Sequence, residues 1–177
     1  LVNGLMLGAL YACIAVGFSL VWGVLNVINM LHGSFIVLGG YLAFFAWRDL
    51  GLHPLISLVG IAAMLFALGW VLQYGLINHI VARPVLTTLT LTFGLDMIVY
   101  NVMTLAFTAT PRRIALDLGV LHASDVVVPV DRIIAMVLAL VLTGLLFLLL
   151  RTSSLGRAIV AVRMDRDAAS LMGIRVE

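Results

Sequence analysis

The residue with the clearest chemical potential is Asp96, a lone acid inside a long apolar stretch. A carboxylate at the centre of a bilayer costs roughly 2.5–3.5 kcal/mol, so it should face protein or water and not lipid. Thr90, Thr92 and Gly94 lie just before it, and on a helix Thr92 shares its face at a spacing of four residues. Three interpretations stay open: a hydrogen bond between helices, the polar lining of a translocation path, and proton coupling.

A second polar group interrupts the first apolar stretch of the chain. It consists of Asn26, Asn29, His32 and Gly33. A break in a membrane helix frees backbone polar groups, which protein or water must then cover. The group therefore predicts either a capped turn at the membrane interface or a further part of the translocation path.

The third candidate is the arginine-bearing segment 155–174, LGRAIVAVRMDRDAASLMGI. Its apolar residues recur at the spacing of one helix face: Leu155, Ala158, Ile159 and Val162. We expect a short amphipathic helix there. Asp165 is placed to cap a second helix, and Gly173 to end it in a left-handed conformation. The pattern predicts a helix pair that docks a soluble partner.

Hydrolytic, metal and nucleotide chemistry find no support in the sequence. The chain has no H-E-x-x-H, no G-x-S-x-G, no paired-cysteine motif and no phosphate-binding GxxxxGK[ST]. The single cysteine, Cys13, lies in an apolar run and fits a small buried residue. All ten basic residues are arginines and they are dispersed, which does not suit nucleic acid. We expect no catalytic residue, no metal and no cofactor, so any ATP hydrolysis must come from partner subunits.

Composition indicates the elements that position these residues. Of the 177 residues 64% are hydrophobic and 10% charged, and the mean hydropathy is +1.24, which indicates an integral membrane protein. We expect an all-α fold, a polytopic transmembrane helical bundle with a short cytoplasmic coupling helix pair. Residues 1–150 should form about five spans, and residues 151–177 the cytoplasmic part. The apolar stretches cover approximately 1–23, 34–47, 54–80, 85–109 and 133–150.

The arginines also predict how the chain is oriented. Five of them lie in the last segment: Arg151, Arg157, Arg163, Arg166 and Arg175. Positive residues favour the cytoplasmic side, so residues 151–177 should be cytoplasmic and Leu1 should lie outside. The polar connection at 110–132 is then outside, and Val126–Val130 within it could form a short strand.

Two separated motifs resemble one known family. Residues 3–43 contain an N-G-x-x-x-G-x-x-Y-A opening, a G-x-x-L-x-x-G pattern and an I-N-x-x-H-G turn. Residues 151–174 contain S-x-x-G-R-A-x-x-A followed by D-x-x-A-A-x-x-x-G-I, and ARPV at 82–85 and TFGLDMI at 92–98 also fit. These resemble the permease subunits of branched-chain amino-acid ABC transporters. One departure is Met30-Leu31, where Phe-Ala is usual.

The resemblance implies a fold, partners and site residues. It implies a permease subunit in the bacterial inner membrane, working with two ATPases, a second related permease and an extracytoplasmic binding protein, surrounded by lipid. It implies that the ATPase-coupling residues are Gly156, Arg157, Ala158, Asp165, Ala168, Ala169 and Gly173. The family continues into further spans beyond the coupling loop, so this chain should correspond to the N-terminal part of a permease.

Several alternatives remain at this point. The substrate could be branched-chain amino acids, urea or short amides. The chain could instead belong to a secondary transporter or channel in which Asp96 couples an ion. It could also be a truncated, non-functional fragment. The terminal helix pair favours the ABC permease, because such a pair has a clear use beneath an ATPase.

Overall fold

The computed structural model describes residues 2–25, 27–80, 83–108, 110–114, 119–123, 126–164 and 166–173. They form a helical membrane bundle, which confirms the predicted fold class. The chain divides into two compact units, residues 1–25 with 116–177, and residues 26–115. Each unit has its own set of helices and is described separately.

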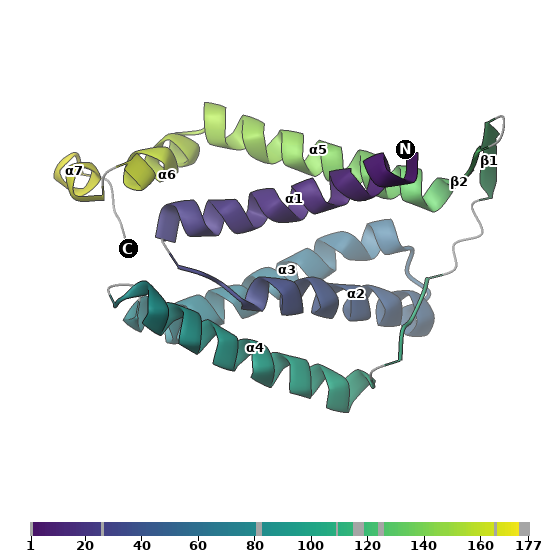
Figure 1. Cartoon of the computed structure of the whole chain (residues 1–177), viewed down its shortest axis with the longest axis horizontal. Helices are drawn as coiled ribbons and strands as arrows, with labels where there is room; N and C mark the ends of the chain where they lie inside the picture. The colour runs from purple at the N-terminus through teal and green to yellow at the C-terminus, as the bar shows by residue number, and fades with distance from the viewer. Residues whose placement is uncertain are drawn as a thin grey trace. The chain divides into compact units, whose positions relative to one another are not determined.

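The first unit is built on two long helices, α1 (Val2–Leu25) and α5 (Val130–Thr152), which lie side by side (Figure 1). Near their first residues Arg132 Nη1 donates to Asn3 Oδ1 at 3.2 Å. Near their last residues Gly23 and Leu150 line one small cavity. Beginnings and ends therefore match, so α1 and α5 run parallel.

Three smaller elements complete this unit. A hairpin of β1 (Val120–Ala123) and β2 (Val126–Pro129) precedes α5, and its strands pair antiparallel with Val120 opposite Pro129. The strand expected at 126–130 is thus confirmed, and its partner strand is an addition. After α5 come α6 (Ser154–Met164) and α7 (Arg166–Leu171), the helix pair expected from the amphipathic pattern.

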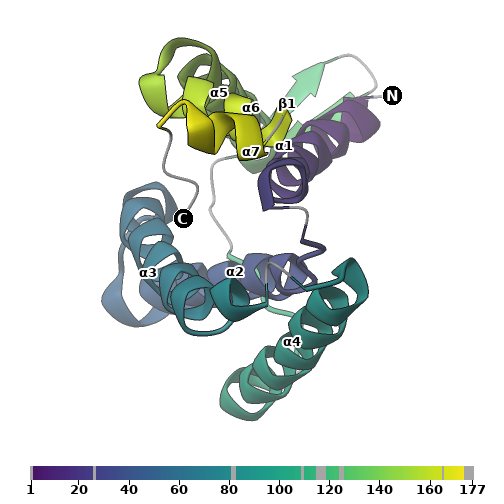
Figure 2. The same cartoon turned by 90° about the vertical axis from the view of Figure 1, so that its left-hand side faces the viewer.

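The second unit has α2 (Leu31–Leu50) at its centre, flanked by α3 (Pro54–Gly75) and α4 (Val85–Phe107) (Figure 2). A short 3-10 helix, η1 (Ile77–His79), follows α3. Gly39 lies near Leu65 and Gly69 near Phe35, so α2 and α3 run antiparallel. Tyr41 stacks on Phe107 while Ser34 contacts Asp96, so α2 and α4 run parallel.

Local sequence explains where α2 ends and α3 begins. Gly51 has φ +64°, a left-handed conformation that glycine adopts without steric penalty, and it closes α2. Pro54 then occupies the first turn of α3, where its missing N–H is not needed. The His53 side chain caps that helix by accepting the amide of Leu55 at 3.4 Å. This turn lies at the expected boundary between the apolar stretches 34–47 and 54–80.

Four stretches of the described chain are long and apolar enough to cross a membrane: Val2–Val24, Pro54–His79, Val85–Phe107 and Val130–Thr152. The remaining long helix, α2, is more polar and packs against both α3 and α4. Helix direction favours a crossing by α2 as well. Two spans that run parallel must have an odd number of spans between them in the chain. Because α3 and α4 are both long and apolar enough to cross, α1 and α5 can run parallel only if α2 crosses as well. Five spans therefore stays our prediction.

Candidate functional site

The first candidate site begins at the break between α1 and α2. Asn29 shapes this turn: its side-chain Oδ1 accepts the amide of Leu31 at 3.1 Å, and its carbonyl accepts the amide of His32 at 3.4 Å. Asparagine commonly folds back on its own backbone in this way. Val27 and Leu31 are almost completely buried and hold the turn by apolar packing. The expected break in the first apolar stretch is therefore present as an ordered turn.

A threonine from α4 covers a backbone carbonyl that this turn leaves without a helical partner. Thr92 is fully buried, and its hydroxyl lies 2.8 Å from the carbonyl oxygen of Ile28 and 3.1 Å from that of Leu89. A buried carbonyl without a partner would destabilise the fold, especially in a membrane. Thr92 therefore joins the two polar groups that the sequence presented separately.

One helical turn further on, Asp96 meets the start of α2. Ser34 Oγ donates to Asp96 Oδ1, and Ser34 itself is buried. This is the hydrogen bond between helices that was one of the expected interpretations. Ser34 was not among the residues predicted from the sequence, although a small hydroxyl residue directly after Gly33 was a signal that could have marked it.

The structure brings together some of the predicted path residues and separates others. Thr88, Thr92 and Asp96 follow one another at spacings of four residues and share one face of α4. Of these, Thr92 contacts Ile28 and Asp96 contacts Ser34. Thr90 and Gly94 lie on an exposed side of the same helix, and the Thr90 hydroxyl bonds only to Leu86 of its own helix in the described chain.

The remaining predicted path residues lie in or near the turn. Gly33 is exposed, and a Cβ atom built on it would contact no other residue within 4 Å. His32 is partly buried. Asn26 lies outside the described residues. Among described residues no group of histidines, cysteines and acids is arranged for a metal ion. The site offers a carboxylate and hydroxyls for hydrogen bonding.

The second candidate site is the junction between α5 and α6. Ser153 caps α6: its Oγ accepts the amide of Gly156 at 2.8 Å, and its carbonyl accepts the amide of Arg157 at 3.1 Å. Arg157 Nη1 in turn donates to the carbonyl of Thr152 at 2.9 Å, which satisfies an end group of α5. Ser153 was not among the residues predicted from the sequence, although a serine three residues before the predicted helix interior is a typical cap.

The junction has no room for a side chain at Gly156. It is buried, and a Cβ atom built on it would lie 2.3 Å from the carbonyl oxygen of Leu150 and 2.5 Å from its Cα. No side chain can occupy that position unless the backbone moves. The close approach fixes the angle at which α6 leaves α5.

Helix α6 is also held against α1. A Cβ atom on Gly23 would lie 3.1 Å from Arg163 Nε, so the arginine side chain rests on the glycine surface of α1. Residues from α1, α5 and α6 together line a cavity of only about 50 Å³. Helix α6 is therefore packed against two spans of its own unit.

The exposed surface of the helix pair carries both apolar and basic side chains. Met164, Leu171 and Met172 are 83%, 88% and 83% exposed. Arg157 and Ala168 are also exposed, Ala158 is partly buried and Ala169 is buried. Gly173 has φ +80°, which confirms the predicted left-handed helix end. The predicted cap Asp165 lies outside the described residues.

The sequence matches a known family over its whole length. Residues 1–177 fit the model described as the branched-chain amino acid transport system permease component. The chain belongs to this family. Family membership and the membrane-length helices together make it a multi-pass membrane protein of the transport permease type.

Three relatives carry the name high-affinity branched-chain amino acid transport system permease protein. BraD from Pseudomonas aeruginosa is 29% identical over 98% of this chain and 61% of its own length. LivH from Escherichia coli is 27% identical over 99% of this chain and 61% of its length, and LivH from Salmonella typhimurium is 26% identical with the same coverage. The chain thus spans about 61% of the length of these curated relatives. No solved structure matches it significantly.

Proposed function

We propose that the chain is a permease subunit of an ABC importer in the bacterial inner membrane, and that it helps to form the translocation path for branched-chain amino acids. The observation that carries this proposal is the α5–α6 junction. A short helix with exposed apolar and basic side chains is packed against two spans, an arrangement that suits an ATPase-coupling element. ATP hydrolysis belongs to partner subunits, so the chain itself is not an enzyme.

Movement can pass through this junction in a simple way. When an ATPase displaces the α6–α7 surface, the close contacts at Gly156 and Gly23 leave little room for α6 to slide. Close-packed contacts transmit a displacement as a rigid-body movement. We propose that α1 and α5 follow α6 and so open or close the path.

The proposed partners are two ATPases beneath the α6–α7 surface, a second related permease and an extracytoplasmic binding protein. The relatives' names favour branched-chain amino acids over urea or short amides. A channel or secondary transporter coupled through Asp96 is less well supported, because Asp96 already bonds to Ser34 and the α6–α7 pair has no evident use there.

Disulfide crosslinking in the assembled transporter tests the docking surface. With Cys13 changed to serine, cysteines at Arg157 or Ala168 should crosslink to cysteines on the ATPase. A cysteine at Leu145, an exposed position within α5, serves as the matched control and should not. If neither position on the helix pair crosslinks under any nucleotide condition, the proposed docking is wrong.

The orientation has its own test. Reporter enzymes fused after Leu150 should be active only as cytoplasmic reporters, because the arginine cluster places 151–177 inside. A fusion scoring as extracytoplasmic would reverse the topology and remove the ATPase from this surface.

A further inference from the structure

The chain turns sharply where α4 ends, and the turn is strained. Thr108 has φ +63° and ψ +161°, and it is the one described non-glycine residue with positive φ. This conformation is almost confined to glycine, and a β-branched residue in it costs about 1–3 kcal/mol. Tyr41 supports the turn by donating from its hydroxyl to the Thr108 carbonyl at 3.1 Å. Such strain tends to collect at functional sites.

The turn brings Arg112 back over the aromatic residues of α2. Its Cζ lies 5.3 Å from the ring centre of Phe44 and 5.1 Å from that of Phe45. Its Nη2 donates to the carbonyl of Phe107 at 3.0 Å. Its Nε is buried without a hydrogen-bond partner in the described structure. The guanidinium is positioned but only partly satisfied.

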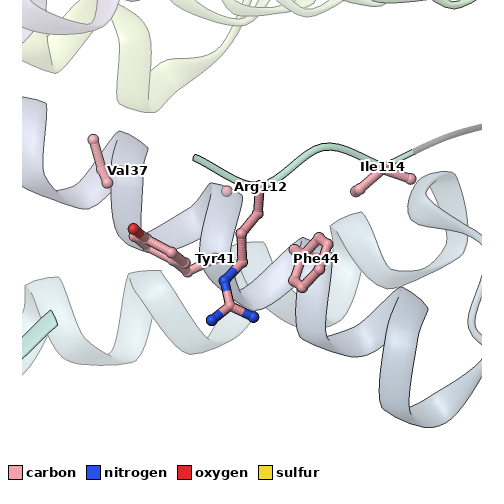
Figure 3. A pocket seen from close by; sticks show the side chains of 6 residues that line it. Val37, Tyr41, Phe44, Arg112 and Ile114 are labelled. Atoms are coloured by element: carbon pink, nitrogen blue, oxygen red, sulfur yellow. The ribbon is translucent and has the colours of Figure 1, made fainter. Parts of the chain in front are cut away.

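Arg112 lines an open cavity of about 300 Å³, at the lower end of the range of roughly 300–1,000 Å³ for small-ligand pockets. Figure 3 shows its side chain descending between Tyr41 and Phe44. The other lining residues are Val37, Gly40 and Ile114. The cavity thus combines one cation with walls that are otherwise aromatic and aliphatic.

We propose that this cavity binds the substrate amino acid on the extracytoplasmic side, with its carboxylate on the Arg112 guanidinium and its aliphatic side chain against Phe44 and Ile114. The proposal rests on the proposed function for the substrate class and on the predicted topology for the side. A planar guanidinium presents paired N–H groups that match a carboxylate, and the flanking rings fix its plane. A partly satisfied arginine in an apolar pocket suits an apolar amino acid better than a sugar or a cation.

Site-directed labelling in nanodiscs tests this binding without the need for uptake. Ile114→Cys is introduced into the assembled transporter with Cys13→Ser, in the absence of the binding protein, and its reaction rate with a maleimide is measured. Leucine should slow the reaction. Isovalerate, which has the carboxylate but no amine, should also slow it, and leucinamide, which has the amine but no carboxylate, should not.

Variants assign the effect to one arginine. Arg112→Gln should raise the leucine concentration for half-protection about tenfold, as expected for the loss of a charge-assisted hydrogen bond. Arg112→Lys keeps the positive charge but loses the paired N–H groups of the guanidinium. Its leucine concentration for half-protection should lie between those of the wild type and Arg112→Gln. Arg113→Gln is the matched control, because Arg113 follows Arg112 directly but is exposed and does not line the cavity.

Three results would overturn the proposal. One is equal protection by leucinamide and leucine, and another is unchanged protection in Arg112→Gln. The third is protection that appears only after the binding protein is added and that does not depend on leucine. In that case the binding protein itself, and not leucine, would occupy the cavity. Absence of leucine uptake by the wild-type transporter would contradict the proposed function instead, and the isovalerate result would still report on the carboxylate site.

Discussion

Two long helices of this chain end in sharp turns, and the turns are built in opposite ways. After α5, the end groups are satisfied by Ser153 and Arg157, and a glycine stands where the backbones approach most closely. After α4, a threonine adopts a conformation suited to glycine, and the Arg112 Nε keeps an unpaired N–H among the described residues.

The difference indicates different tasks. A turn whose polar groups are paired and whose backbone is unstrained has one preferred geometry, so it can transmit movement. A turn that stores strain and holds a cation beside an open cavity is suited to gain stability when a ligand binds there. We therefore assign coupling to the α5–α6 junction and binding to the turn after α4.

The largest effect should come from Gly156→Ala. The added Cβ would meet the Leu150 backbone at 2.3 Å, so α6 must shift, and we expect a loss of about 3 kcal/mol in stability together with loss of ATP-driven uptake. Thermal unfolding in detergent and uptake in proteoliposomes measure the two. Gly144→Ala on α5, where nothing lies within 4 Å, is the control and should change stability by less than about 0.5 kcal/mol. Wild-type behaviour of Gly156→Ala would show that the junction is not rigid.

An intermediate effect is expected at the hydrogen bond between α2 and α4. Ser34→Ala removes the donor to Asp96 and should cost about 1–3 kcal/mol. Asp96→Leu should preserve insertion but reduce uptake, and Asp96→Asn should be milder if the role is hydrogen bonding. In the Asp96→Leu background Ser34→Ala should add little, because the two changes remove the same interaction. Additive losses, or wild-type uptake in both Asp96 variants, would contradict this role.

The smallest effect concerns the strained turn. Thr108→Gly should relieve the strain and raise the stability by about 1 kcal/mol, measured by thermal unfolding. Thr110→Gly, on the same segment, should instead lower it slightly, because glycine makes the unfolded chain more flexible. Equal destabilisation by both changes would mean that the turn after α4 stores no strain and that the contrast with the α5–α6 junction is wrong.

Local features of the fold were predictable from the sequence. Hydrophobic runs, the Asn29 break, the Gly51–Pro54 boundary and the left-handed Gly173 each depend on neighbouring residues, so composition and turn chemistry sufficed. The strand at 126–130 was predicted by its β-branched run, but its partner at 120–123 was not.

Features that depend on distant residues could not be predicted. The Ser34–Asp96 and Ile28–Thr92 bonds join residues more than sixty positions apart, and no local pattern pairs them. Thr90 and Gly94 were grouped with Asp96 by proximity in the sequence, yet the helical period places them on another side of α4. Gly156 was named through the family resemblance alone, since its contact with Leu150 depends on the angle between two helices.

The most direct test of the account measures whether α6 moves with the spans. Spin labels at Trp22 on α1 and Met164 on α6, both exposed, report the distance between them in the assembled transporter. A second pair, from Met164 to the ATPase, reports that the ATPases have closed. The account predicts that closure changes the second distance and leaves the first unchanged. A shift of about 5 Å in the first, one helical turn, would show that α6 slides over α1 and would contradict rigid coupling.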